Sequence, residues 1–290
     1  MNLEFRNAER KQVKLKILVQ GLAGSGKTYS SLLLAYGITK DWAKIGLVDC
    51  EAGSAHLYAN LGQYKILTLN SYSPDDYIKS IDVAEKSNLE VLILDGISPC
   101  WEFLLNYHAS LAGNSFVNWS KVTLLQDKFV MRILNSNMHI ICTARKKTNF
   151  ILKNENGKMI PERVGWRTIK RDGLNYNFSI EFDLDLNHFA ICEKDRTSLF
   201  SSKEKFMITP EVGDTILKWC ESGIKVDDVR TLIKGCSTME QLTEIFYKYP
   251  EWSKLLADDF VQQKQLLLPA KTITNNSNSI NYGNITAQAS

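Results

Sequence analysis

The stretch that decides the fold spans residues 21–28 and consists of Gly21, Leu22, Ala23, Gly24, Ser25, Gly26, Lys27 and Thr28. It matches the pattern GxxxxGK(S/T) of a phosphate-binding loop, whose glycines let backbone N–H groups point at the phosphates of a nucleotide. In this pattern Lys27 reaches the β- and γ-phosphate oxygens, and the hydroxyl of Thr28 is a Mg²⁺ ligand. We therefore expect this loop and the adjoining Tyr29 to bind a nucleoside triphosphate.

The residues on both sides of the loop predict a strand before it and a helix after it. Apolar residues recur at every second position, as in a strand, at Val13, Leu15, Ile17 and Val19. Residues 30–36 are rich in Leu and Ala, as in a helix, whose N-terminal dipole favours a bound anion. The order strand, loop, helix favours a nucleotide site over a chance glycine-rich turn.

Strand-like and helix-like segments alternate from residue 13 to about residue 145. The predicted strands are residues 14–20, 45–49, 65–69, 91–95 and 139–143, and the helices between them include residues 74–86 and 119–134. Such alternation is typical of a parallel sheet with helices on both faces. We therefore predict an α/β fold.

The pattern changes after residue 145. Residues 148–160 predict a hairpin, and residues 178–193 predict two strands joined by a short turn at Asn187-His188. We expect these strands to extend the sheet in an antiparallel manner, and a helix over residues 210–220 to close the core.

The chain divides into four predicted regions. Residues 1–12 form an N-terminal extension, and residues 13–223 form the nucleotide-binding core. Residues 224–268 form a C-terminal helical region, with short helices near residues 226–234, 238–247 and 250–265. Residues 269–290 are rich in Asn, Ser and Thr, and we expect this tail to be disordered because it can bury little apolar surface.

The composition excludes several classes of protein. No apolar run approaches the ~18 residues that cross a bilayer, and residues 1–12 lack the apolar segment of a signal peptide. We therefore expect a cytoplasmic protein with no membrane partner. The six cysteines are widely spaced and form no CxxC pair, which favours buried free thiols over disulfides or zinc. A net charge of +3 is too small by itself to indicate nucleic acid.

Two carboxylates follow predicted strands at the edge where ligands bind in open α/β folds. Asp95 ends the apolar strand 91–95, where it can hold Mg²⁺ through water; the alternative is a cap for the next helix. Hydrolysis also needs a group that positions water near the γ-phosphate. Gly96 follows Asp95 directly, so Glu51, at the end of an earlier strand, is the predicted catalytic residue; the alternative is a surface glutamate in a turn.

These segments resemble, in the same order, those of RecA-type recombinase ATPases over about residues 13–200. Residues 48–52 resemble the segment that carries the catalytic glutamate of that family, and residues 91–98 resemble its metal-binding strand. Tyr58 falls where the family stacks a tyrosine on adenine. The overall pattern is most similar to small phage-encoded RecA-like ATPases that act as single-strand annealing proteins. The resemblance implies a RecA-like P-loop ATPase core that uses ATP and Mg²⁺.

Residues 193–196 resemble the basic segment with which that family reaches the ATP of a neighbouring subunit. The resemblance implies that Lys194 and Arg196 are catalytic cations supplied in trans, in a homo-oligomer with ATP at its subunit interfaces. The alternative is a pair of charges that keeps an edge strand from aggregating.

The chain also departs from RecA at particular positions. RecA ends its sensor strand with a glutamine, whereas this chain has Thr143-Ala144-Arg145, so Thr143 or Arg145 is expected to contact the nucleotide. Ala55 stands where RecA has an adenine-contacting aspartate, and residues 1–12 are too short for RecA's N-terminal oligomerisation helix.

The segment over residues 145–177 is strongly basic and carries aromatic side chains. Cations follow a phosphate backbone, and aromatic rings stack on bases. RecA-type proteins place their DNA-binding loops after the sensor strand, which is the position of this segment. We therefore predict binding of single-stranded DNA through Lys146, Lys147, Lys153, Arg163, Trp166, Arg167, Lys170 and Arg171. The alternative is a solvated basic insertion with a core tryptophan.

The sequence thus favours an ATP- and Mg²⁺-dependent RecA-like ATPase that binds single-stranded DNA and promotes annealing or strand exchange in phage recombination. Its expected location is the cytoplasm of a bacterial host, and a single-strand-binding protein is a further candidate partner. Other classes stay open: a P-loop ATPase that acts on protein partners, a nucleotide switch with little turnover, and a small-molecule kinase with residues 148–160 as its lid.

Overall fold

The computed structural model describes residues 5, 7–51, 53–155, 158–171 and 173–268; the tail that we expect to be disordered, residues 269–290, lies outside this part. The chain divides into two compact units, residues 1–223 and residues 224–290. No helix in the described part of the chain is long and apolar enough to cross a membrane.

The first unit is built on a sheet in which nine strands are described. Along the sheet the order is β3 (Lys65–Thr68), β2 (Ile45–Asp49), β4 (Val91–Asp95), β5 (His139–Glu155), β1 (Lys16–Gly21), β7 (Ile180–Leu184), β8 (Phe189–Asp195) and β9 (Phe206–Met207). The first six of these pair in parallel, and β8 and β9 are antiparallel. The ninth strand, β6 (Lys158–Thr168), pairs only with β5.

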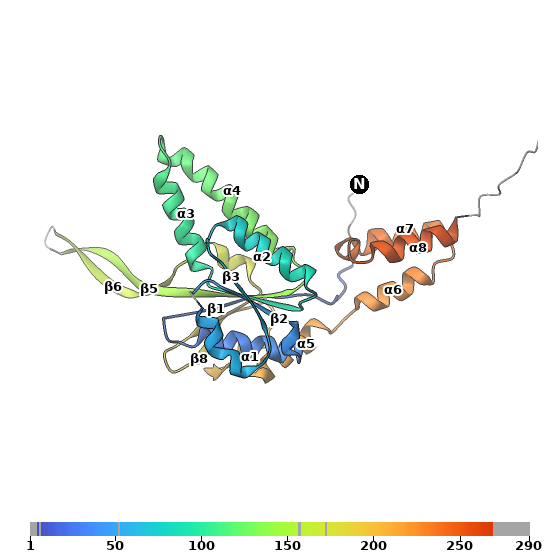
Figure 1. The fold of residues 1–290 in the computed structure, drawn as a ribbon, viewed down its shortest axis with the longest axis horizontal. Coiled ribbons are helices and arrows are strands. Elements are labelled where there is room, and N and C mark those ends of the chain that lie inside the picture. Colours follow the sequence, from blue (N-terminus) through green and yellow to red (C-terminus); the bar gives the residue numbers. More distant parts are fainter. Residues whose placement is uncertain (1–4, 6, 52, 156–157, 172, 269–290) are drawn as a thin grey trace, which may run out of the picture. The chain divides into compact units, whose positions relative to one another are not determined.

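Helices cover both faces of this sheet (Figure 1). One face carries α1 (Lys27–Thr39) and α5 (Pro210–Cys220), and the other carries α2 (Pro74–Lys86), α3 (Ser98–Ser110) and α4 (Ser115–Leu134). Strands β1, β2 and β4 are buried along their whole length, as in parallel sheets that are covered on both sides. The predicted α/β fold with a mostly parallel sheet and an antiparallel extension is therefore confirmed.

Helices α1 and α5 cross closely because each has a glycine at the crossing point. A Cβ atom on Gly37 would lie 2.0 Å from the carbonyl oxygen of Pro210, and one on Gly213 would lie 2.3 Å from that of Leu34. Any larger residue would push the helices apart. Since α1 begins at Lys27, this crossing fixes the position of the phosphate-binding loop relative to the core.

Most predicted elements are present with ends shifted by up to four residues, and three features differ more. Strand β5 continues past Thr143 to Glu155 and pairs with β6 up to Thr168, so the predicted hairpin is present but longer; its Asn156-Gly157 turn lies outside the described residues. Helix α3 was not predicted, although Pro99 at its first turn suits a helix start. Beyond β1, the antiparallel extension consists of β8 and β9, because β7 joins β1 in parallel.

The second unit is helical. It contains α6 (Val226–Lys234), α7 (Met239–Lys248), a short 3-10 turn (Pro250–Trp252) and α8 (Ala257–Leu267), so the helix predicted over residues 250–265 is divided in two. Its own core includes Val229, Ile233, Leu242, Tyr249, Trp252 and Leu256. Across both units the six cysteines are free thiols, and all but Cys192 are fully buried, as predicted.

Candidate active site

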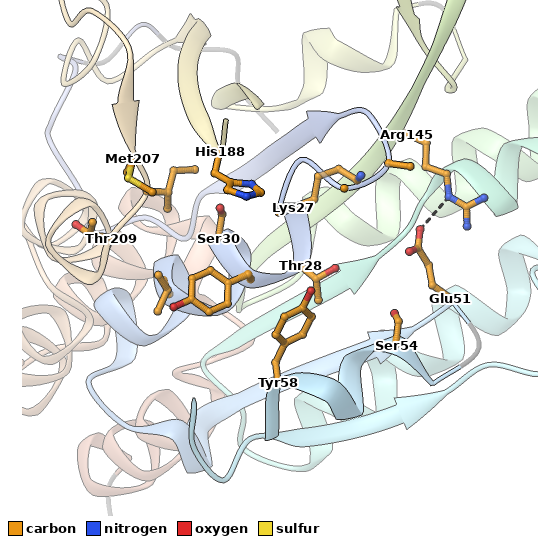
Figure 2. Close-up of a pocket in the computed structure, with 16 residues that line it drawn as sticks. Lys27, Thr28, Ser30, Glu51, Ser54, Tyr58, Arg145, His188, Met207 and Thr209 are labelled. Atoms are coloured by element: carbon orange, nitrogen blue, oxygen red, sulfur yellow. Dashed lines mark hydrogen bonds and ion pairs between the residues drawn. The ribbon is translucent and has the colours of Figure 1, made fainter. Parts of the chain in front are cut away.

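A cavity of about 770 Å³ lies at the carboxyl edge of the parallel strands. Its described lining consists of Ala23, Gly24, Gly26, Lys27, Thr28, Tyr29, Ser30, Leu33, Glu51, Ser54, Tyr58, Arg145, His188, Met207, Ile208 and Thr209. In Figure 2, Lys27 lies between the Glu51–Arg145 pair and a group formed by His188, Met207 and Thr209. The cavity therefore has two chemically different ends on either side of the phosphate-binding loop.

The phosphate-binding loop has the backbone that its glycines predict. Gly24 and Gly26 have φ angles of 82° and 81°, in the left-handed region that other residues rarely adopt. The Lys27 ammonium donates to the carbonyl oxygen of Leu22 at 2.9 Å. Burial lowers the pKa of Lys27, while the nearby Glu51 and Asp95 carboxylates oppose that shift. A phosphate group at this loop would give the buried cation a counter-charge.

Asp95 connects the loop to the neighbouring strands. Its two carboxylate oxygens accept hydrogen bonds of 2.8 Å from the hydroxyls of Thr28 and Thr143. Burial raises the pKa of Asp95 to about 6, although both hydroxyls lower it in part. Parallel pairing explains this cluster, because Val19 lies opposite Thr143 and Leu94 lies opposite Cys142.

These residues fit a Mg²⁺ ion. The Thr28 hydroxyl donates its hydrogen to Asp95, so an oxygen lone pair stays available to a cation, and the buried Asp95 carboxylate gains from a positive charge nearby. In the described part of the chain no group of three His, Cys, Asp or Glu residues could hold a metal ion. A Mg²⁺ ion here would thus depend on phosphate oxygens and water for its other ligands, as is common for this ion.

Glu51 lies in the cavity beside Gly96. Its backbone N–H donates to the buried Asp49 carboxylate at 2.7 Å, which fixes the chain where β2 ends. Its own carboxylate accepts a hydrogen bond of 2.9 Å from the guanidinium of Arg145, drawn as a dashed line in Figure 2. A Cβ atom added to Gly96 would lie 3.8 Å from the Glu51 carboxylate. Glu51 therefore lies in the same cavity as Lys27 and Thr28, on the side of Arg145.

Some, but not all, of the predicted nucleotide-binding residues line the cavity. Tyr58 and Tyr29 line the cavity with ring centroids 5.9 Å apart. Four predicted residues are not among the described lining residues: Gly21, Leu22, Ser25 and Thr143. Seven lining residues were not predicted to bind nucleotide. Ser30, Leu33 and Ser54 are close in sequence to predicted residues, and four are distant from the loop in sequence: His188, Met207, Ile208 and Thr209. These four carry no phosphate motif, and only the pairing of β7, β8 and β9 brings them to the loop.

Lys194 and Arg196 lie away from the cavity of their own chain. Strand β8 runs antiparallel to β7, so Lys194 pairs with Glu181 toward the amino end of the parallel strands. The Lys194 ammonium donates to the carbonyl oxygen of Asn175, and the Arg196 guanidinium donates to that of Tyr176. Burial and the neighbouring Arg196 lower the pKa of Lys194. Any contact of these cations with a nucleotide would need a second subunit.

Two of the predicted DNA-binding cations are held against the core. Lys146 forms ion pairs with Asp183 at 2.6 Å and with Glu193 at 3.7 Å, and its side chain is only 12% exposed. Arg171 pairs with Asp127 at 3.2 Å. Lys170 is half-buried. These contacts come from strands and helices distant in sequence, so the charge pattern alone could not reveal them.

Other predicted DNA-binding residues are exposed on the β5–β6 hairpin, which we define as residues 145–168. Lys147 lies directly opposite Arg167, and Thr148 lies opposite Trp166. Lys147, Lys153 and Arg167 are exposed, and Trp166 is 46% exposed rather than in the core. The side chain of Arg163 lies outside the described ones.

Hydrogen bonds connect the base of this hairpin to the cavity. The Arg145 backbone N–H donates to the Ser98 hydroxyl at 2.9 Å, and that hydroxyl donates to the carbonyl oxygen of Ile169 at 2.8 Å. The Thr168 hydroxyl donates to the Gln20 side chain at 2.7 Å, one residue before the loop begins. The hairpin is thus bonded to both sides of the phosphate-binding region.

The match to a protein family agrees with this geometry. Residues 13–207 match the AAA_24 family, which is described as an AAA domain. This match spans more than half of the chain, so the chain belongs to that family and is a P-loop ATPase of the AAA type. No curated protein matches it.

Among solved structures, the chain is similar to the crystal structure of a KaiC-like protein from the hyperthermophilic archaeon Pyrococcus horikoshii OT3. The identity is 18%, the TM-score is 0.40, and the match covers 68% of this chain and 86% of that chain.

Proposed function

We propose that this AAA-domain protein uses ATP and Mg²⁺ to act on single-stranded DNA, promoting annealing or strand exchange. The observation that carries the proposal is the continuity of β5. Strand β5 bears Thr143, which donates a hydrogen bond to Asp95, and Arg145, which lines the nucleotide cavity. The same strand continues past a β-bulge at Asn149 and Phe150 into the basic β5–β6 hairpin. A single strand of this kind can couple the state of the nucleotide to a nucleic acid held on the hairpin.

The cavity supplies the groups that hydrolysis needs. Lys27 neutralises charge on the β- and γ-phosphates, and Thr28 and Asp95 would hold Mg²⁺, which neutralises further phosphate charge when bound. Glu51 is the group that orients and deprotonates the attacking water, and it can do so only when its carboxylate is not paired with Arg145. An incoming γ-phosphate is a competing partner for Arg145, so nucleotide binding favours release of Glu51.

The proposed ATPase is a homo-oligomer. Lys194 and Arg196 lie at the end of the sheet away from the loop, so they would reach the ATP of a neighbouring subunit rather than their own. A cation supplied in trans stabilises charge on the transferred phosphoryl group. Hydrolysis would then rise with assembly.

The hairpin is the proposed DNA site. Lys147 and Arg167 place two exposed cations directly opposite each other across two strands, which concentrates positive charge where it can follow a phosphate backbone. The Trp166 side chain is 46% exposed, and an aromatic ring is the kind of group on which a base can stack.

The test is ATP hydrolysis with and without single-stranded DNA, titrated over protein concentration. We expect DNA to stimulate hydrolysis, with a cooperative dependence on protein concentration because the active unit is an oligomer. If the rate of ATP hydrolysis is the same with and without DNA and rises linearly with protein concentration, both the role of DNA and the trans-acting cations are rejected.

A charge-removal variant locates the DNA site. Replacing both Lys147 and Arg167 by alanine should lower the slope of log affinity against log salt by about 1.4, since each phosphate contact on a single strand contributes about 0.7. The matched control replaces Lys121 and Lys128, exposed on α4, and should leave the slope unchanged. Equal slopes for all three proteins would remove the hairpin as the DNA site.

A second candidate is a P-loop ATPase or nucleotide switch that acts on protein partners. The observation that favours it is a set of exposed apolar side chains on α3 and α4: Phe103, Leu105, Phe116, Val117 and Leu124. Exposed apolar patches often mark protein interaction sites. Hydrolysis that is indifferent to DNA would favour this candidate.

A further inference from the structure

The cavity is polarised along its length. Toward Glu51 and Arg145 the groups are charged, and the phosphate-binding residues Lys27 and Thr28 lie in the middle (Figure 2). The opposite end carries Met207 and Thr209 (Figure 2), with Ile208 between them in the chain, and the side chains of Met207 and Ile208 offer nothing to a phosphate. A nucleoside triphosphate has the same polarity, with a charged chain at one end and a flat, largely apolar base at the other.

His188 stands where these two halves meet. It occupies the turn between β7 and β8, lines the cavity and is exposed. Its Nδ1 atom lies 3.0 Å from the position that a Cβ atom on Gly26 would take, so the imidazole packs directly against the loop. Neither ring nitrogen forms a hydrogen bond or ion pair with another residue in the described part of the chain.

The turn that carries His188 is held in place by Asp185. One Asp185 carboxylate oxygen accepts from the backbone N–H groups of Asn187 and Phe189, and the other pairs with Lys205 at 3.0 Å. His188 has a φ angle of 68°, a left-handed conformation that the turn imposes. Its neighbour Phe189 pairs with Met207, so the sheet register places the imidazole beside Met207.

We infer that His188 contacts the nucleoside part of the bound nucleotide, the ribose or the base, and not the phosphate chain. The position next to Gly26 and beside Met207 supports this, together with the two ring nitrogens that are open to a ligand. Asp185 is a positioning residue for this contact. The inference rests on the proposed use of ATP but is independent of DNA.

The test compares two ligands that share a phosphate chain, ATP and inorganic tripolyphosphate, each titrated calorimetrically with Mg²⁺ into the full chain. The variants are His188→Gly and His188→Asn, because glycine and asparagine both tolerate the left-handed conformation of the turn. The matched control is His56→Ala, an exposed histidine that is not among the described lining residues.

We expect both His188 variants to weaken ATP binding about tenfold, the scale of one lost contact, and to change tripolyphosphate binding by less than about twofold. The His56 variant should match the wild type for both ligands. Unchanged ATP affinity would overturn the inference, and so would an equal loss for both ligands, since His188 would then only support the loop at Gly26. A folded wild-type chain that fails to bind ATP would reject the proposed function as well.

Discussion

At one end of the nucleotide cavity charged side chains bond to one another, whereas the other end carries the exposed side chains of Met207 and His188. Glu51 is paired with Arg145, and Asp95 accepts from two threonines. Met207 is 52% exposed and His188 is exposed. At the charged end, a nucleotide that binds must therefore replace existing hydrogen bonds and ion pairs between side chains. At the other end it has only to cover exposed side chains. We expect substitutions at the charged end to change turnover, and those at the other end to change affinity.

The largest effect should come from Lys27→Ala. Its ammonium is the cation of the phosphate-binding loop, so its loss leaves the β- and γ-phosphates without a counter-charge. We expect no measurable ATP hydrolysis and no tripolyphosphate binding by calorimetry. Retained hydrolysis would show that the loop is not the phosphate site.

Glu51→Gln should separate binding from turnover. Glutamine keeps the shape of the side chain but cannot accept a proton, so kcat should fall by roughly 10²- to 10⁴-fold while ATP still binds. Single-turnover hydrolysis together with calorimetry measures both quantities. Normal turnover would remove Glu51 as the catalytic group and leave it as a partner of Arg145.

Asp95→Asn should change how the free energy of unfolding depends on pH. The raised pKa of Asp95 means that the folded chain holds this proton more tightly than the unfolded chain. Its contribution to stability is therefore full below about pH 4 and is lost as the pH rises through about 6. Without Mg²⁺, the wild type should gain about 1 kcal/mol from pH 8 to pH 5 relative to the variant. Urea unfolding at the two pH values measures this, and equal pH dependence would contradict it.

Tyr58→Ala should have the smallest effect. Loss of one aromatic contact costs about 0.5–1.5 kcal/mol, so KM for ATP should rise by roughly two- to tenfold with kcat unchanged. Steady-state kinetics measures both constants. A fall in kcat without a change in KM would contradict the expectation that this substitution changes affinity and not turnover.

The parts of the site that sequence could predict are those set by local chain geometry. The loop at residues 21–28 and Asp95 at the end of an apolar strand follow from short motifs, and parallel pairing then brings them together. Glu51 could be placed in the same way, because it follows β2 directly.

Other features depend on contacts between distant segments. His188 reaches the loop only through the pairing of β7 with β1, and Lys146 is neutralised by Asp183 and Glu193 from two other strands. Sequence spacing carries no signal for such contacts. The full length of β5 was also not predicted, since its second half is mostly polar and pairs with β6.

The length of β5 has a mechanical consequence. From Arg145 to Glu155 the strand advances about 33 Å at ~3.3 Å per residue, stiffened by its partner strand. A rotation of about 5° at its base would displace the far end by about 3 Å, by the same geometry. A small rotation of the strand at Arg145, the residue whose side chain is bonded to Glu51, would therefore become a displacement of several ångströms at the far end of the hairpin.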